Sequence, residues 1–109
     1  MSALGDQLER LAAVIADRRN ADPSASYTAK LLAGGAPKAA KKLGEEVVEV
    51  VIAAVAETPD ALAAESADLL YHWLVLLQTR GVSLDAVAAR LAEREGVSGL
   101  VEKAARGGT

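Results

Sequence analysis

Hydrophobic positions recur along this chain three and four residues apart, which is the spacing of helices that bury one face. The first such segment covers residues 6–19, where Asp6 and Glu9 have the spacing of an N-terminal capping pair. Residues 20–26 are rich in turn-forming side chains, and Pro23 cannot continue a helix. The pattern therefore predicts a helix followed by a turn.

A second helix is predicted after residues 26–32, a short segment of mixed character. Gly34 and Gly35 interrupt the chain there, and Pro37 suits the first turn of a helix that runs to about Glu57. The apolar stripe of this helix consists of Leu43, Val47, Val50, Val51 and Ala54. Such a stripe indicates one face that packs against another helix.

A third helix follows almost directly. Thr58 is suited to the N-cap and Pro59 to the first helical position. The helical pattern extends to about Arg80, where Gly81 favours a C-terminal stop. Its apolar positions are Leu62, Leu69, Leu70, Trp73, Leu76 and Leu77. Two long helices joined by a short turn predict a helical hairpin.

A fourth helix is predicted from its cap at Ser83 to Gly96, with Val82 and Val87 placed as a hydrophobic staple. The side chains expected to face inward are Leu84, Val87, Ala88 and Leu91. Residues 97–109 are expected to form a C-terminal tail. Because the chain has no strand-like alternation of any length, the predicted fold class is all-α.

Length and composition narrow this picture. The 109 residues fit a single domain over 1–109, with an ordered core over about 6–96. A net charge of −3 and very few aromatic side chains disfavour nucleic-acid binding. The chain contains no cysteine, which excludes disulfides and thiol chemistry. There is no apolar run of about 18 residues and no secretory signal, so we expect a cytoplasmic protein without a membrane partner.

Two pairs of acidic residues stand out on the predicted hairpin. Glu46 and Glu49 are three residues apart on one helix, and Glu65 and Asp68 are three apart on the next. Each pair therefore shares a helix face, although a single acidic residue on a helix is usually solvated surface. If the helices pack antiparallel, the four carboxylates meet and repel one another unless a cation compensates. An all-oxygen site of this kind favours Mg²⁺, with Mn²⁺ as an alternative.

Lysines precede the acidic pairs. Lys38, Lys41 and Lys42 lie about one turn before them, and Lys30 lies in the preceding segment. Taken alone, Lys38 and Lys41 are typical of a solvated patch. Lys42 stands four residues before Glu46, the less favourable orientation for a helical ion pair, which suggests another role. Because lysine binds phosphate as a point charge, acids and lysines together indicate a polyphosphate held through a metal ion.

Gly44 and His72 are unusual residues for their helices. Gly44 costs about 1 kcal/mol relative to alanine within a helix, which suggests close approach by a ligand or a neighbouring backbone. His72 follows Asp68 by four residues and shares its face. A lone histidine is more typical of a packed, hydrogen-bonded residue than of a metal ligand.

The acidic pairs and four longer stretches resemble a known family. The pattern ExxE followed by ExxD is similar to that of the MazG-type all-α NTP pyrophosphatase superfamily. Within it, the chain resembles the phosphoribosyl-ATP pyrophosphohydrolase family of histidine biosynthesis over about residues 8–106. The stretches that carry this resemblance are SYTAKLL at 26–32, KKLGEEVVE at 41–49, ESADLLYH at 65–72 and REGVSGL at 94–100.

The resemblance implies hydrolysis of 1-(5-phospho-β-D-ribosyl)-ATP to the corresponding AMP derivative and pyrophosphate. It implies that the four acids bind metal and that Glu45 or Glu49 orients or deprotonates the attacking water. The candidate substrate-binding residues are Lys30, Lys41, Lys42, Arg94 and Lys103. Arg94 and Lys103 lie at the two ends of the segment 94–103, which could close on the phosphoribosyl end of the substrate.

The resemblance also implies a homodimer or larger assembly. A single hairpin with short flanking helices cannot cover two apolar faces, so hairpins from two chains would complete a four-helix core. The residues themselves are also compatible with two other functions. One is a house-cleaning NTP or dNTP pyrophosphatase of the same fold, and the other is a non-enzymatic helical assembly module.

Overall fold

The computed structural model of this protein describes residues 3–95, and every regular element within that range is helical. The all-α fold class is therefore confirmed. The elements are α1 (Ala3–Asp17), the short 3₁₀ helix η1 (Arg18–Asn20), α2 (Tyr27–Ala33), α3 (Gly35–Ala56), α4 (Pro59–Thr79) and α5 (Leu84–Arg94). The predicted tail at 97–109, with Lys103, lies outside the described residues, as does the predicted helix end at Gly96.

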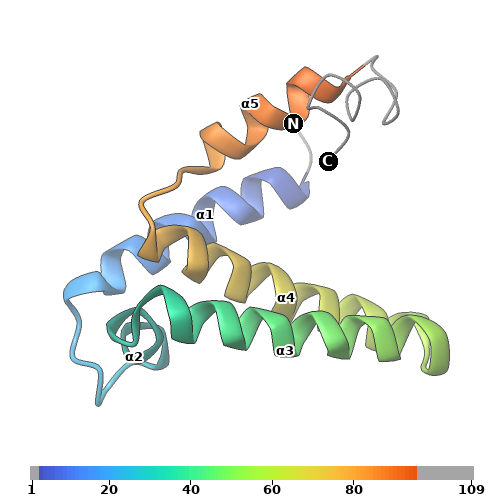
Figure 1. Ribbon diagram of the computed structural model, residues 1–109, viewed down its shortest axis with the longest axis horizontal. Helices are drawn as coiled ribbons and strands as arrows, with labels where there is room; N and C mark the ends of the chain where they lie inside the picture. The colour runs from blue at the N-terminus through green and yellow to red at the C-terminus, as the bar shows by residue number, and fades with distance from the viewer. Residues whose placement is uncertain (1–2, 96–109) are drawn as a thin grey trace.

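Helices α3 and α4 run antiparallel and form the long hairpin that dominates the molecule (Figure 1). The short helix α2 packs against both of them near the start of α3, and α1 packs against α4. Helix α5 diverges from the hairpin, and none of its residues is buried (Figure 1). The predicted hairpin with flanking helices is thus present in a single chain.

Side-chain caps begin three of these helices. The hydroxyl of Ser26 accepts a hydrogen bond from the Ala29 amide at 3.2 Å, which starts α2. The Thr58 hydroxyl accepts from the Ala61 amide at 3.1 Å at the start of α4. The Ser83 hydroxyl accepts from the Ala86 amide at 3.1 Å at the start of α5. The predicted caps at Thr58 and Ser83 are confirmed. The helix that begins after Ser26 was not predicted.

The end of α4 uses a glycine in the left-handed conformation. Gly81 has a φ of +66°, and the amide of Val82 reaches back to the Leu77 carbonyl at 3.0 Å. Only glycine adopts this φ without steric cost, so Gly81 closes the helix as predicted.

The first predicted helix boundary is wrong. Helix α1 begins at Ala3 rather than Asp6, so Asp6 lies in the first turn and does not cap the helix with Glu9. An acidic residue in this turn still interacts favourably with the helix dipole. The turn after η1 is held instead by Asp22, whose carboxylate accepts from the Ser24 amide at 2.9 Å and from its hydroxyl at 2.8 Å. These hydrogen bonds lower the pKa of Asp22.

The hydrophobic core lies at the end of the hairpin next to α1 and α2. Its buried residues come from four helices and are Ile15, Leu31, Ala39, Leu74 and Val75. Beyond Ala39, the only other buried residue of α3 is Ala53. The core therefore supports one half of the hairpin and leaves the other half exposed.

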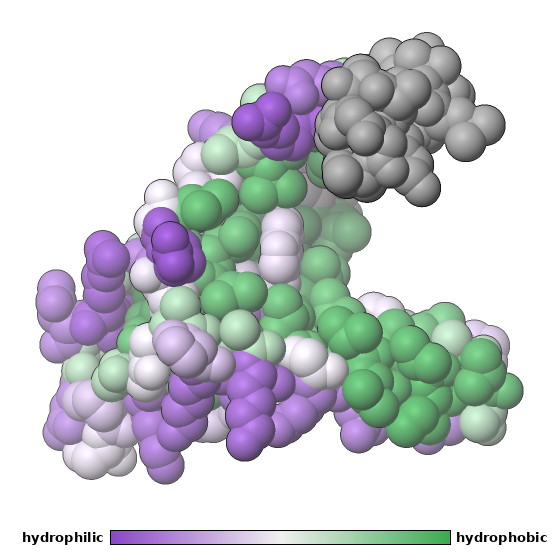
Figure 2. All heavy atoms as spheres, viewed as in Figure 1, coloured by the Kyte–Doolittle hydropathy of each residue, from purple (hydrophilic) through white to green (hydrophobic). Residues whose placement is uncertain are grey.

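The exposed half carries many apolar side chains, visible as a hydrophobic surface over the free end of the hairpin (Figure 2). On α3 the exposed members are Val47, Val48, Val51, Ile52 and Val55. Of the predicted α3 stripe, only Leu43 and Val50 are partly buried in one chain. On α5, Ala88 and Leu91 are exposed rather than inward-facing because no other described helix covers them.

No helix among residues 3–95 is long and apolar enough to cross a membrane.

Candidate metal and phosphate site

Three of the predicted acidic residues converge on the hairpin. Glu46 on α3 and Glu65 and Asp68 on α4 each offer a carboxylate oxygen, and these oxygens lie within 4.8 Å of one another. Glu46 and Glu65 are half-buried, whereas Asp68 is exposed. Antiparallel packing of α3 and α4 brings Glu46 to the α4 pair, so three of the four predicted carboxylates converge. We call these three residues the carboxylate triad.

The carboxylates around the triad repel one another. Partial burial raises the pKa of Glu65, and the negative charges of Glu49, Asp68 and Glu46 raise it further. A divalent cation held by the same oxygens would reverse this repulsion. The donor set consists only of carboxylate oxygens, which suits a hard cation such as Mg²⁺ or Mn²⁺.

Glu49 stands beside the triad rather than within it. It is exposed on α3, one turn after Glu46, and its oxygens are not part of the group that converges within 4.8 Å. Its charge nevertheless contributes to the raised pKa of Glu65, second only to burial. Glu49 therefore adds to the negative field at the triad.

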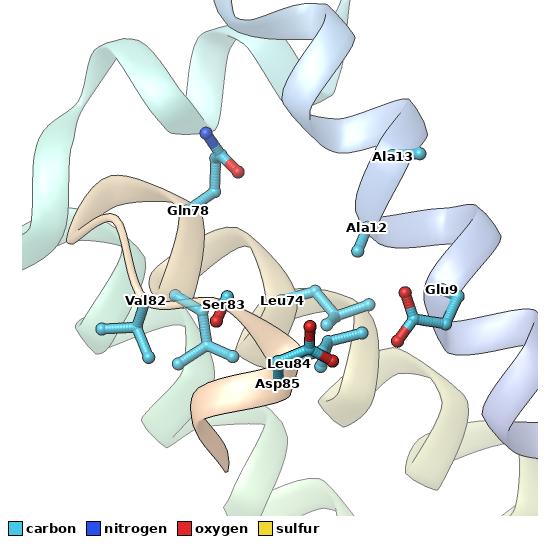
Figure 3. A pocket seen from close by; sticks show the side chains of 10 residues that line it. Glu9, Ala12, Ala13, Leu74, Gln78, Val82, Ser83, Leu84 and Asp85 are labelled. Carbon is cyan, nitrogen blue, oxygen red and sulfur yellow. The ribbon is translucent and has the colours of Figure 1, made fainter. Parts of the chain in front are cut away.

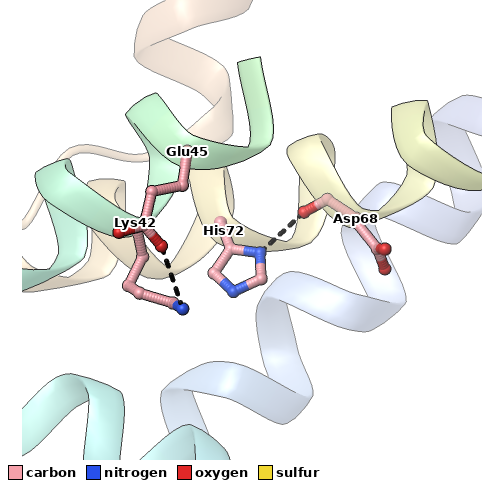
Figure 4. Close-up of polar contacts among 4 residues, drawn as sticks. All are labelled: Lys42, Glu45, Asp68 and His72. Atoms are coloured by element: carbon pink, nitrogen blue, oxygen red, sulfur yellow. Dashed lines mark hydrogen bonds and ion pairs between the residues drawn. The ribbon is translucent and has the colours of Figure 1, made fainter. Parts of the chain in front are cut away.

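Lys42 and Glu45 form an ion pair on α3, with the Lys42 ammonium 3.2 Å from a Glu45 carboxylate oxygen (Figure 4). The hydrogen bond to Glu45 and its charge raise the pKa of Lys42, with smaller contributions from Tyr27 and Glu46. The sequence-based interpretation considered only Glu46, four residues on, as an ion-pair partner for Lys42. The pairing with Glu45 uses i, i+3 spacing, which also places side chains on one face.

The other predicted substrate-binding residues are less closely grouped. Lys30 is exposed on α2, and Lys41 is exposed on α3. Arg94 lies in the last turn of α5, which Figure 1 shows far from the hairpin, so one chain does not bring Arg94 to the triad. At Gly44, a Cβ would meet nothing within 4 Å among residues 3–95, so no neighbouring backbone of that range approaches it closely. Close approach by a ligand stays a prediction.

His72 is buried at 7% exposure, one turn after Asp68 on α4. Its Nδ1–H donates to the backbone carbonyl oxygen of Asp68 at 2.8 Å (Figure 4). Beside it, the hydroxyls of Tyr71 and Thr28 share a hydrogen bond of 2.6 Å, which ties α2 to α4. The expectation of a packed, hydrogen-bonded histidine is confirmed. Its neighbourhood with Tyr27 and α2 was missed, because that helix was not predicted.

A separate hollow of about 300 Å³ lies between α1, the end of α4 and the start of α5 (Figure 3). Glu9 and Asp85 approach it from α1 and α5, above a floor that includes Leu74 and Leu84. None of the predicted metal or phosphate ligands lines it. The candidate chemistry is therefore on the open surface of the hairpin rather than in this hollow.

Comparisons with known proteins identify the family. The family model described as phosphoribosyl-ATP pyrophosphohydrolase matches residues 8–95. A phosphoribosyl-ATP pyrophosphatase of Caulobacter sp. (strain K31) is 70% identical over 106 residues, which cover 97% of this chain and 98% of the relative. The phosphoribosyl-ATP pyrophosphatase of Parvibaculum lavamentivorans is 58% identical over 107 residues, with 98% of each chain covered. This chain therefore belongs to the phosphoribosyl-ATP pyrophosphohydrolase family.

Proposed function

We propose that this protein hydrolyses 1-(5-phospho-β-D-ribosyl)-ATP to 1-(5-phospho-β-D-ribosyl)-AMP and pyrophosphate, the second step of histidine biosynthesis, in the cytoplasm. The observation that carries the proposal is the carboxylate triad, formed by two helices of a chain that matches the family model over residues 8–95. The names of its relatives favour this substrate over the NTP and dNTP alternative. They also favour an enzyme over a helical assembly module.

The triad fits a divalent cation, Mg²⁺ or Mn²⁺. Glu46, Glu65 and Asp68 would hold the ion, and Glu49 is the nearby fourth carboxylate. When bound, such an ion shields the charge of the substrate phosphates and stabilises the transition state of phosphoryl transfer. The raised pKa of Glu65 supports this assignment, because the residue lies in a negative field that a cation would neutralise.

Glu49 is the stronger candidate for orienting or deprotonating the attacking water. Glu45 was the other candidate, but its carboxylate is engaged by the Lys42 ammonium at 3.2 Å. Glu49 is exposed and close enough to affect Glu65 electrostatically. A general base needs this combination of access and proximity to the reacting phosphate.

Lys42 is the best-placed phosphate ligand. It is partly exposed on α3, one turn before Glu46, and its pKa is raised by acidic neighbours so that it stays protonated. Glu45 would hold the ammonium toward the site while its remaining N–H donors bind phosphate. Lys30 and Lys41 would add positive charge near the outer phosphates.

The substrate assignment is tested by turnover of the purified protein with phosphoribosyl-ATP and with a panel of NTPs and dNTPs, with Mg²⁺ present. We expect kcat/KM for phosphoribosyl-ATP to exceed that for every other nucleotide by at least about 100-fold, because specific polar contacts to the second sugar phosphate are lost otherwise. Equal or faster hydrolysis of a dNTP would support the house-cleaning alternative. No hydrolysis of any nucleotide would support the assembly module.

We further propose that the functional unit is a homodimer in which a second copy covers the exposed half of the hairpin. Five apolar residues of α3 are exposed there in one chain, with Val55 exposed by 81%. Exposed apolar patches of this kind on a helical hairpin mark an interface. Packing two hairpins together yields a four-helix arrangement next to the triad.

A further inference from the structure

One nitrogen of the buried His72 ring has a partner and the other does not. The Asp68 carbonyl oxygen can only accept, so Nδ1 carries the hydrogen in their 2.8 Å hydrogen bond. In the neutral ring, Nε2 is then an acceptor. Nε2 is buried and has no hydrogen-bond partner among residues 3–95. A buried acceptor without a donor costs free energy, so this atom points to a donor that engages it in the working enzyme.

The rings around His72 limit where that donor can come from. Tyr71 packs edge-on against His72 with ring centroids 4.9 Å apart, but its hydroxyl is engaged with Thr28. The Tyr27 ring also lies edge-on to His72, with ring centroids 6.5 Å apart. Tyr27 also contributes electrostatically to the raised pKa of Lys42. In Figure 4 the Lys42 ammonium and the free edge of the imidazole face the same space between α3 and α4.

Lys42 has N–H donors to spare for the unpaired Nε2 of His72. An ammonium has three N–H donors, and the ion pair with Glu45 uses one of them. The Lys42 side chain is 34% exposed and flexible, so a small rotation changes where its head points.

We propose that His72 is a positioning residue: its Nε2 accepts a hydrogen bond from the Lys42 ammonium in the substrate complex, which leaves the third N–H for a substrate phosphate. This inference rests on the proposed function. Glu45 and His72, from two different helices, together hold the head of a flexible side chain in one orientation. In the substrate complex, these two contacts fix the ammonium so that its third N–H points at the phosphate.

A double-mutant cycle with Lys42→Met and His72→Phe tests this directly, with phosphoribosyl-ATP at saturating Mg²⁺. Phenylalanine keeps a ring against the two tyrosines but has no acceptor. We expect His72→Phe to raise KM about tenfold with a much smaller change in kcat, as expected for one hydrogen bond to a charged group. In the Lys42→Met background, His72→Phe should change kcat/KM less than about twofold, because the partner is already gone.

Two further variants separate positioning from simple structural support. His72→Gln retains an amide acceptor and should recover part of the lost kcat/KM. Tyr71→Phe removes the adjacent hydrogen bond to Thr28 and serves as the matched control. It should lower the Tm without altering KM.

Specific outcomes would overturn the inference. Equal losses from His72→Phe in both backgrounds would show that His72 does not act through Lys42. A higher Mg²⁺ concentration for half-maximal activity in His72→Phe would show instead that it acts through Asp68. An unchanged KM in Lys42→Met would remove Lys42 from phosphate binding. The proposed function is tested separately on the wild-type protein, and it fails if that protein does not hydrolyse phosphoribosyl-ATP or hydrolyses a dNTP equally well.

Discussion

Glu65 is the residue whose surroundings say most about the site. It is half-buried on α4, between the charges of Glu49 and Asp68, and its pKa is raised. A carboxyl group with a raised pKa favours the folded state when protonated, and that contribution is lost as pH rises through the folded-state pKa. Without metal, the ionised Glu65 therefore destabilises the folded protein at neutral pH.

Glu65→Gln should consequently raise the Tm of the metal-free protein at pH 7, because it removes one repelling charge. The difference should shrink as pH falls below the ordinary glutamic acid pKa of 4.5, where the wild-type side chain also becomes protonated. Added Mg²⁺ should raise the wild-type Tm more than that of the variant. Thermal melts across pH, with chelator or Mg²⁺, measure all three effects. Equal Mg²⁺ stabilisation of both proteins would contradict the assignment of Glu65 as a ligand.

Residue spacing indicated that acidic residues of the two hairpin helices meet, but it did not show that Glu49 lies outside the converging group, and it could not supply their neighbours. The i, i+3 rule places Glu46 near Glu49 and Glu65 near Asp68, and hairpin packing brings Glu46 to the α4 pair. The rule does not choose between Glu45 and Glu46 as the partner of Lys42, because both lie within its reach. The environment of His72 depends on α2, which contacts α3 and α4 only in the folded chain.

At the scale of helices, local signals explain most boundaries. Thr58, Pro59 and Gly81 predicted the limits of α4 because caps and a left-handed glycine act within a few residues. Helix α2 has only seven residues, too few for a clear hydrophobic period, and it is held by tertiary contacts that include the hydroxyl pair of Thr28 and Tyr71. Its cap at Ser26 was the available local signal.

A pair of glycine substitutions tests this account of the helices. Gly81→Ala should destabilise the protein by about 1 kcal/mol, because alanine is strained at a φ of +66°. Gly44→Ala should stabilise the isolated fold by up to about 1 kcal/mol, because Gly44 lies inside α3 with open space around it. Urea unfolding gives both values. A destabilising Gly44→Ala would show that another chain or segment approaches this position closely.

At the scale of the whole molecule, the single chain is an incomplete helical bundle. Its core occupies one end of the hairpin, and valines and an isoleucine of α3 line the exposed other half (Figure 2). The sequence predicted that a single hairpin with short flanking helices cannot cover both of its apolar faces. It could not say which apolar residues the chain itself would cover, because α5 diverges from the hairpin instead of packing along it (Figure 1).

Val51→Asp should convert the proposed dimer to a monomer, since it places a charge at the centre of the exposed α3 surface. Sedimentation velocity at micromolar concentration measures the change. Val14→Asp is a matched control on α1, where the wild-type side chain is 47% exposed. It should leave the assembly unchanged. A monomeric wild-type protein, or dissociation by Val14→Asp alone, would contradict an interface on the hairpin.

The central claim is that carboxylates of α3 and α4 support Mg²⁺-dependent hydrolysis of phosphoribosyl-ATP. Its most direct test is the rate of pyrophosphate release from this substrate by the wild-type protein, Glu49→Gln and Asp68→Asn. We expect equimolar phosphoribosyl-AMP and pyrophosphate from the wild-type protein with Mg²⁺, and none with chelator. Each substitution should lower kcat by at least about 100-fold, as expected for groups that stabilise or activate the reacting atoms. Near-wild-type turnover by either variant would contradict the proposed site.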